Sequence, residues 1–193
     1  DIRALLSGSN AENESAQERA RRERAREGAA GIVSFSCDSD VHHAAFAVSG
    51  RLFMCDMHHA HEIMVNNAAP GTIYDARISP DGKHIAYVRG SALYVCDTQG
   101  NEKCLTPEIA TDVSWGVAEF VAAEEMNRQR GYWWSPNSDA LVVERVDNSP
   151  IELITIADPS QPTTDPQTRR YPFAGTNNAR TSLHVIDLEA CST

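Results

Sequence analysis

The chain lacks several patterns that mark other classes of protein. No uninterrupted run of eighteen apolar residues exists, although a membrane-spanning helix needs about that length. The start Asp1-Ile2-Arg3 lacks the basic-then-apolar pattern of a secretory signal. Five cysteines are an odd number and include no C-x-x-C pair, which predicts buried free thiols and a reducing compartment. With no signal or transmembrane segment within the chain, a cytoplasmic location is favoured.

Positive charge is also scarce. Lys and Arg number 17 against 27 Asp and Glu, giving a net charge of −10. Nucleic acid and anionic membranes both require a basic surface, so the composition argues against either partner and favours a cationic ligand. With 193 residues and 41% apolar composition, the chain can bury one sizeable core or two small ones.

Short apolar runs bounded by turn residues dominate the chain after Gly31, which predicts an all-β fold. One group of four runs reads as consecutive antiparallel strands: Ile73–Ile78, His84–Arg89, Ala92–Asp97 and Lys103–Thr106. The first two are joined by Ser79-Pro80-Asp81-Gly82, where Pro fixes the second turn position and Gly tolerates a left-handed exit.

The same design recurs along the chain. Ser36-Cys37-Asp38-Ser39 precedes expected strands at Ala44–Val48 and Arg51–Met57, and Ser135-Pro136-Asn137-Ser138 precedes Ala140–Val146 and Ile151–Ile156. A four-stranded unit that repeats every 40 to 45 residues, approximately, is typical of β-propeller blades. We therefore predict a partial propeller over 31–193, with blades at about 31–66, 71–107, 113–158 and 168–193.

The predicted fourth blade is incomplete. Thr181–Leu188 reads as its strand, after a proline-punctuated loop from Asp158 to Pro166. Because a propeller closes by pairing its last blade with its first, three blades and part of a fourth predict a piece of a larger ring. Residues 1–30 form a separate segment, in which Ala11–Glu27 is expected to be a charged, solvent-exposed helix.

Two adjacent carboxylates, Glu124 and Glu125, lie in an insertion that enters the third unit. The interval between equivalent turns is longer there, and the additional residues are Glu119 to Arg130. Neighbouring like charges are unfavourable unless water or a cation relieves them. The pair is therefore either solvated or part of a binding site, and loops on a rigid scaffold often carry such sites.

The stretch around this pair resembles a known family. Glu124-Glu125 followed by Trp133-Trp134-Ser135-Pro136-Asn137 is similar to the propeller domain of the dipeptidyl peptidase IV family, in the prolyl oligopeptidase group of serine peptidases. The similarity continues through Tyr171–Asn178 and Leu183–Asp187, and extends weakly back to the Arg-rich helix. It covers about Arg19 to Glu189.

The resemblance implies a role for the chain. In this family an eight-bladed propeller covers an α/β-hydrolase domain, and dipeptides are released from peptide N-termini, usually after Pro or Ala. Glu124 and Glu125 are then expected to bind the free α-ammonium of the substrate. The insertion is expected to form a short helix, because neighbouring helical residues diverge by only about 100° and can direct both carboxylates at one cation. The implied partners are peptides with a free N-terminus and a C-terminal hydrolase domain of the same parent chain; a homodimer stays open, and no cofactor is expected.

The chain also departs from the family. It contains no Gly-x-Ser-x-Gly nucleophile elbow and no alternation of strands and helices that could hold a catalytic triad. This fragment alone is therefore expected to be inactive and to hold no catalytic residue. The family's substrate-binding arginine has no matching motif here; Arg51 and Arg89 are in strands, outside any such motif.

Two alternative functions stay open at this stage. A non-enzymatic propeller that binds other proteins would have no hydrolase domain in the full reading frame. An endopeptidase or acyl-peptide hydrolase of the same group would have no use for an anionic amine site.

Other polar and aromatic groups favour structural roles. The histidines at 42, 43, 58, 59 and 61 have no helical H-E-x-x-H register, so a metal site is not predicted. Glu119 is expected to be structural, and Trp133 and Trp134 are expected to pack between blades.

Overall fold

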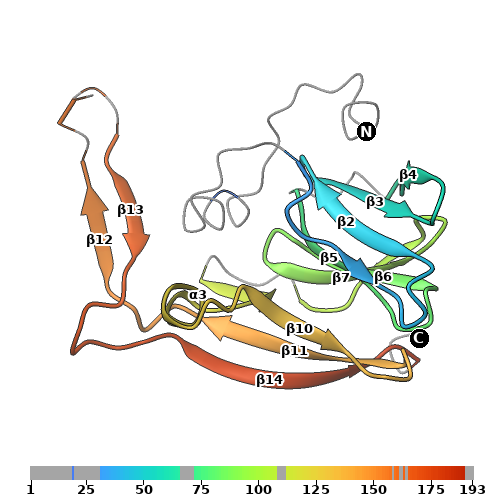
Figure 1. Cartoon of the computed structure of the whole chain (residues 1–193). Coiled ribbons are helices and arrows are strands. Elements are labelled where there is room, and N and C mark those ends of the chain that lie inside the picture. The colour runs from blue at the N-terminus through green and yellow to red at the C-terminus, as the bar shows by residue number, and fades with distance from the viewer. Residues whose placement is uncertain are drawn as a thin grey trace.

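The computed structural model describes residues 31–65, 72–107, 112–157 and 165–189, together with Arg19, Pro159, Ser160 and Thr163. Apart from Arg19, the helix predicted within 1–30 lies outside the described residues, as does Cys191. Within the described part, three antiparallel sheets and one projecting hairpin make up the fold, and only one short helix accompanies them (Figure 1). No helix among these residues is long and apolar enough to span a membrane.

The first sheet follows the order of the chain, β1-β2-β3-β4. Its strands are β1 (Ser36–Cys37), β2 (Ala44–Val48), β3 (Arg51–Cys55) and β4 (Ala60–Glu62). Ser49 and Gly50 join β2 to β3 with positive φ values of 51° and 72°, which suits a two-residue hairpin turn. Phe46 and Phe53 stack across this hairpin at 5.5 Å between ring centroids.

The second sheet repeats the same meander, β5-β6-β7-β8. Its strands are β5 (Ile73–Ile78), β6 (His84–Arg89), β7 (Ala92–Asp97) and β8 (Glu102–Cys104). The predicted turn at Ser79 to Gly82 is present: Gly82 N donates to Ser79 O at 2.9 Å, and Gly82 has φ +74°. Ser79 is fully buried, and its hydroxyl donates to Asp81 Oδ1 at 2.6 Å.

The third sheet has the order β10-β9-β11-β14, and β10 also pairs with β11. Its strands are β9 (Val113–Val117), β10 (Arg130–Trp134), β11 (Ala140–Asp147) and β14 (Arg180–Asp187). The strand predicted at Thr181–Leu188 as part of a fourth blade pairs instead along the whole of β11, from Ala140↔Asp187 to Asp147↔Arg180. That part of the prediction is wrong, because the outer strand of the third sheet is reached only after a long excursion of the chain.

The excursion is the hairpin β12 (Leu153–Ile156) and β13 (Gln167–Arg170), which projects away from the sheets (Figure 1). The predicted strand at Ile151–Ile156 thus pairs with β13 and contributes nothing to the third sheet. Arg170 fixes the base of the hairpin. Its Nε and Nη2 donate to the two carboxylate oxygens of Asp112 at 2.6 and 2.7 Å, and Nη1 donates to Ile151 O.

Replacing Asp112 by Asn is expected to loosen the base of this hairpin. The hydrogen bond from Arg170 holds the pKa of Asp112 below its ordinary value, so the charged form is favoured in the folded protein. Such a group stabilises the fold fully above its unfolded pKa of about 3.9, and this contribution is lost as pH falls through the lowered pKa. At neutral pH, amide exchange in β12 and β13 of Asp112→Asn should accelerate, whereas the exposed control Asp165→Asn on the same hairpin should match wild type. Equal protection in both variants would contradict the role of the ion pair.

Two apolar clusters join the three sheets. One lies between the first and second sheets and includes Leu52, Ile85 and Tyr87, each at most 1% exposed. The other lies between the second and third and includes Leu93, Tyr132 and Leu141. Of the two options that the sequence leaves open, one sizeable core or two small ones, these clusters correspond to the second, and they hold the sheets as consecutive blades.

Candidate functional site

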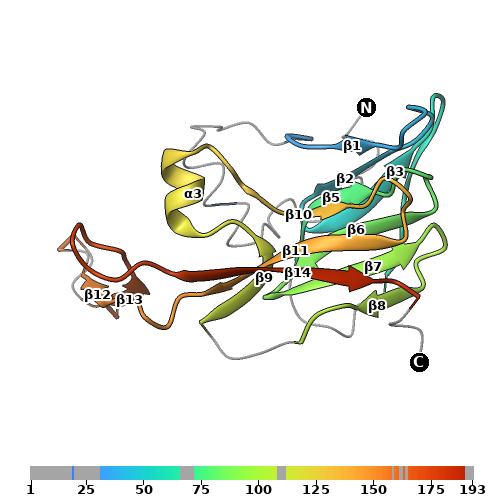
Figure 2. The same cartoon turned by 90° about the horizontal axis from the view of Figure 1, so that it is seen from below.

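The predicted helical insertion is present as α3 (Phe120–Glu125), between β9 and β10. Figure 2 shows α3 on the same side of the molecule as β1 and β10, which are edge strands of their sheets. The two ends of this insertion lie close together: Gly131 of β10 pairs with Gly116 of β9, and Ala118 N donates to Gln129 O at 3.4 Å. The insertion is therefore a closed loop held by the inner strands of the third sheet.

Glu119 fixes the beginning of α3. Its backbone is extended, with φ −70° and ψ 168°, and its carboxylate accepts hydrogen bonds from Val121 N and Ala122 N at 2.6 Å each. These amides would otherwise lack a partner in the first helical turn. The prediction that Glu119 is structural agrees with this geometry.

The end of α3 is fixed by residues that no sequence motif marks. Met126 N and Arg128 N both donate to Ala122 O, at 3.2 and 3.0 Å, and Gln129 Nε2 donates to Ala123 O at 3.2 Å. Asn127 between them adopts φ +51°, a region that Asn tolerates better than most residues. The helix therefore ends in a tight turn and cannot extend.

Arg128 then ties this turn to the sheet. Its guanidinium forms an ion pair with Glu144 of β11, a residue only 4% exposed, and Nη1 also donates to Arg130 O at 2.9 Å. The hydrogen bond and charge of Glu144 raise the pKa of Arg128, so the guanidinium stays charged. A buried carboxylate without its partner costs several kcal/mol, so the contact fixes the position of the loop.

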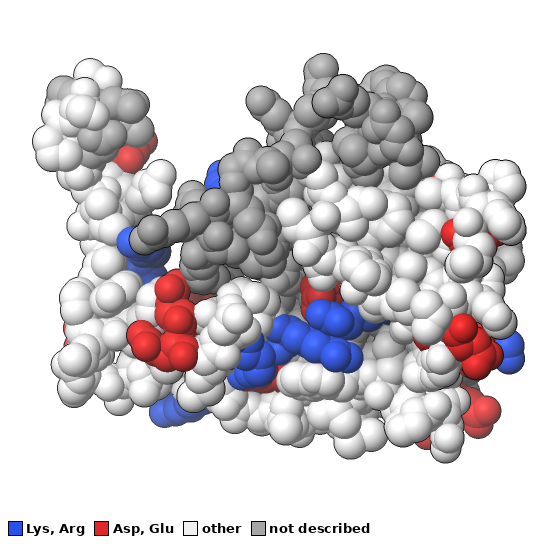
Figure 3. Space-filling view, in the orientation of Figure 1, with Lys and Arg blue, Asp and Glu red and all other residues white. Residues whose placement is uncertain are grey.

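Glu124 and Glu125 occupy the last turn of this clamped helix, and both are exposed. The preceding residues Ala122 and Ala123 are buried and face the protein. Successive helical residues diverge by about 100°, so the two carboxylates can approach one cation from adjacent directions. Acidic side chains lie over the region of α3 in the space-filling view (Figure 3). Within the described part of the chain, the side chain of Glu125 makes no hydrogen bond or ion pair.

A cleft of about 690 Å³ lies beside α3, but neither glutamate of the pair lines it. The helix contributes Glu119, Phe120 and Ala123 to the cleft, and the projecting hairpin contributes residues such as Leu153 and Arg169. The buried side of α3 thus faces this cleft, whereas the carboxylate pair is presented elsewhere on the surface.

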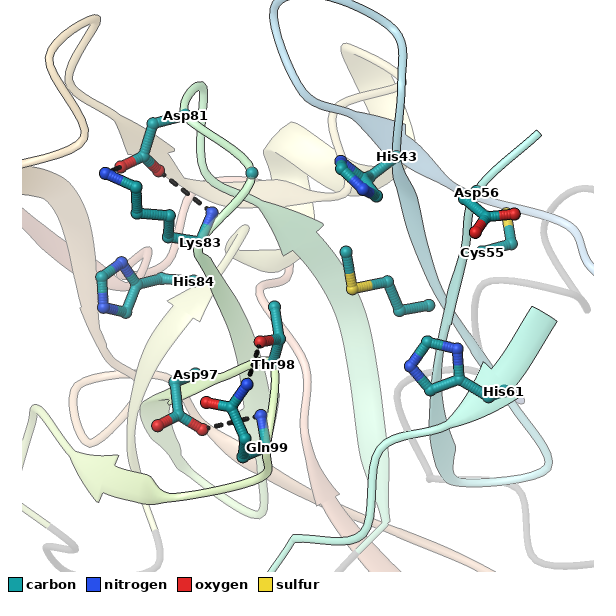
Figure 4. A pocket seen from close by; sticks show the side chains of 12 residues that line it. His43, Cys55, Asp56, His61, Asp81, Lys83, His84, Asp97, Thr98 and Gln99 are labelled. Carbon is teal, nitrogen blue, oxygen red and sulfur yellow. Dashed lines mark hydrogen bonds and ion pairs between the residues drawn. The ribbon is translucent and has the colours of Figure 1, made fainter. Parts of the chain in front are cut away.

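A second cleft, of about 720 Å³, lies between the first and second sheets. Figure 4 shows its polar lining, which includes three histidines (His43, His61, His84) and three aspartates (Asp56, Asp81, Asp97). All three aspartates accept local hydrogen bonds, for example from Gln99 N to Asp97 Oδ1 at 2.9 Å and from Lys83 N to Asp81 Oδ1 at 3.2 Å. No set of three His, Cys, Asp or Glu in the described ranges has the geometry to hold a metal ion. We therefore assign these carboxylates to turn formation.

The aromatic run after the insertion joins β10 to the second sheet. The buried Tyr132 hydroxyl donates to Ala86 O at 2.9 Å, and Trp134 Nε1 donates to Arg77 O at 3.1 Å. Trp134 packs against the cluster between the second and third sheets, whereas the Trp133 ring lies under the Arg130 guanidinium at 5.5 Å. These contacts hold the strand that follows the carboxylate pair.

Comparison with known proteins then decides the family. The sequence model of one protein family, the dipeptidyl peptidase IV (DPP IV) N-terminal region, matches residues 28–193. The chain belongs to this family. Its relatives include human dipeptidyl peptidase 8, 25% identical over 143 residues, and dipeptidyl peptidase 4 of Trichophyton tonsurans, 30% identical over 125 residues. These alignments cover 65% and 61% of this chain but only 16% of either relative.

The fold agrees with this membership of the DPP IV N-terminal family. A crystal structure of Porphyromonas gingivalis dipeptidyl peptidase 4 matches with a TM-score of 0.67 at 22% identity, over 87% of this chain and 26% of that one. The predicted all-β propeller fold is confirmed. The chain spans about one sixth of the length of the curated relatives named above.

Proposed function

We propose that this chain is the substrate-orienting propeller region of a serine-type dipeptidyl peptidase. In this proposal Glu124 and Glu125 bind the protonated N-terminus of a peptide, and an α/β-hydrolase domain of the same parent chain cleaves after the second residue. Family membership supports the class of enzyme. The observation that carries the role of the pair is its position: two exposed carboxylates on the last turn of a helix that is fixed at both ends.

The chemistry of the α-amino group suits this site. Its pKa of about 7.7 to 8.0 leaves it mostly protonated at neutral pH. The ammonium offers three N–H donors, and hydrogen bonds between ionised partners are shorter and stronger than neutral ones. An internal peptide bond carries no such charge. Binding of the terminus would therefore select chain ends over internal segments.

The rigidity of the loop gives this binding a geometric consequence. With Glu119 at the beginning of α3 and Arg128 after its end, the pair keeps a constant position relative to the blades. A substrate held at its terminus presents a peptide bond at a fixed distance, and such positioning can supply a large part of a rate enhancement. We infer that the propeller sets the length of the released product.

The proposal is tested with the full-length protein and matched peptides. Peptides with a free N-terminus should be hydrolysed to release dipeptides, whereas the same peptides N-acetylated should be cleaved at least about a hundredfold more slowly, since they lack the charge that forms the strong hydrogen bonds. Equal kcat/KM for both forms would refute the amine site and favour an endopeptidase or acyl-peptide hydrolase. Absence of hydrolysis of either form by folded protein would favour an interaction module. The homodimer stays a prediction, which sedimentation of the intact protein would test.

A further inference from the structure

Two arginines, Arg77 and Arg130, lie on the inner strands β5 and β10. Each strand forms one edge of its sheet, and in a propeller the blades surround a central channel. The Trp134 indole and the Tyr132 hydroxyl donate to β5 and β6 backbone oxygens, so β10 lies alongside the second sheet. Arg77 of β5 and Arg130 of β10 are therefore neighbours across a blade boundary.

The charges of these two arginines are unequally compensated. Arg77 is paired with Asp75, with Nη2 at 2.7 Å and Nε at 3.2 Å from the two carboxylate oxygens. Arg130 donates from Nε to Tyr132 O at 2.7 Å and stacks on Trp133, but within the described part of the chain it forms no ion pair. Burial, followed by the nearby charge of Arg77, lowers the pKa of Arg130. The charge of Asp75 acts on Arg130 in the opposite sense but belongs to the ion pair with Arg77, so this half-buried guanidinium has no ion-pair partner of its own among the described residues.

The backbone beneath the arginine pair is unusual for a strand. Asp75 has φ +50°, and the pairing of β5 with β6 shifts between Tyr74 and Arg77. A non-glycine residue with positive φ is uncommon, and β-bulges often redirect side chains next to functional sites. Asp75 and Arg77 form their ion pair at this distortion, and Arg130 is the cation of the two that has no ion pair among the described residues.

The position of Arg130 relative to the carboxylate pair suggests a ligand. Arg130 is the first residue of the strand into which the α3 loop leads, five residues after Glu125. Figure 3 shows basic side chains in a hollow beside the acidic side chains that lie over α3. A ligand spanning both would carry an ammonium and, a few bonds away, an anion. In a peptide, the nearest such anion to the α-ammonium is the side-chain carboxylate of an acidic first residue.

We propose that Arg130, with Arg77 beside it, binds the side-chain carboxylate of a peptide whose first residue is Glu or Asp. The inference rests on the proposed function, since Glu124 and Glu125 must hold the α-ammonium of the same residue. Arg130 is then a specificity residue and takes no part in bond cleavage. A guanidinium suits a carboxylate because its planar N–H groups can form two parallel hydrogen bonds.

The test compares two substrates that differ only in charge. Full-length protein is given Glu-Pro and Gln-Pro amides of the same fluorogenic amine. Wild type should prefer the Glu substrate by about tenfold in kcat/KM, the size of one partly solvated charged hydrogen bond. Arg130→Gln should remove this preference while retaining kcat/KM on Gln-Pro, Arg130→Lys should restore part of it, and Arg130→Glu should reverse it. Arg145→Gln, on β11, is the matched control and should keep the wild-type preference.

The outcomes separate this inference from the proposed function. Absence of a Glu preference in wild type, or equal losses on both substrates in Arg130→Gln when its thermal unfolding matches wild type, would overturn the role of Arg130. A Glu125→Gln variant should lower both substrates alike and leave their ratio unchanged. If that variant has no effect on either substrate, the amine site itself is wrong.

Discussion

The double variant Glu124→Gln, Glu125→Gln of the full-length protein is expected to lose at least about a hundredfold in kcat/KM on free-amine dipeptide substrates. Each hydrogen bond between a carboxylate and an ammonium is worth about 1.5–3 kcal/mol, and about 1.4 kcal/mol corresponds to a factor of ten. Glutamine keeps the size of the side chain and its helical propensity, so α3 should remain intact. The loss then reports the missing negative charge.

Single variants and a control make this result specific. Glu124→Gln and Glu125→Gln should each cause a smaller loss, and the coupling between them measures how far they act as a pair. Glu152→Gln changes an exposed glutamate outside α3 and should leave kcat/KM at the wild-type value. Double-variant activity within about twofold of wild type on free-amine substrates would show that the pair is merely solvated.

Gly131→Ala is expected to be the most damaging small substitution in the third sheet. A Cβ at this position would lie 2.4 Å from Val117 N and 2.5 Å from Gly116 C, both backbone atoms. Backbone cannot rotate away as a side chain can, so β9 and β10 would have to separate at the base of the α3 loop. Overpacking of this kind costs about 3 kcal/mol, which lowers the melting temperature by roughly 2–4 °C per kcal/mol in a domain of 150–250 residues.

The loss in Gly131→Ala should appear both in stability and in activity. Because the pairing of Gly131 with Gly116 closes the α3 loop, amide exchange in 118–130 should accelerate along with the fall in melting temperature. Gly175→Ala is the control: a Cβ there meets nothing within 4 Å, and only its φ of +85° costs energy, about 1–2 kcal/mol. A melting temperature for Gly131→Ala equal to that of the control would show that the strands can separate freely.

Much of the fold could be predicted from local patterns. The strands β2, β5, β6 and β7 have the predicted limits, because alternating or continuous apolar runs between turn residues determine them. The turn at Ser79 to Gly82 is predictable because its proline and glycine each suit one position of a tight turn. The insertion carrying Glu124 and Glu125 is predictable from the longer interval between repeated turns, and its helical form from the need to direct two neighbouring carboxylates at one cation.

Long-range pairing could not be predicted in the same way. The strand β14 joins β11 only after the hairpin β12–β13 has left the sheet, and no local pattern distinguishes such a return from the start of a new blade. The ion pair between Arg128 and Glu144 joins the turn after α3 to strand β11, sixteen positions further along the chain. Arg130 could not be selected from the sequence, because its lack of an ion pair depends on β10 lying against β5, where Asp75 is already paired with Arg77.

We propose that Glu124 and Glu125 together hold the ammonium of a peptide terminus. The most direct measurement is a crystal structure of the full-length protein with an uncleaved free-amine peptide. We expect the α-nitrogen to lie about 2.7–2.9 Å from carboxylate oxygens of both residues, the range of charge-assisted hydrogen bonds. A bound peptide whose terminal nitrogen lies elsewhere, with both carboxylates in bulk water, would contradict it.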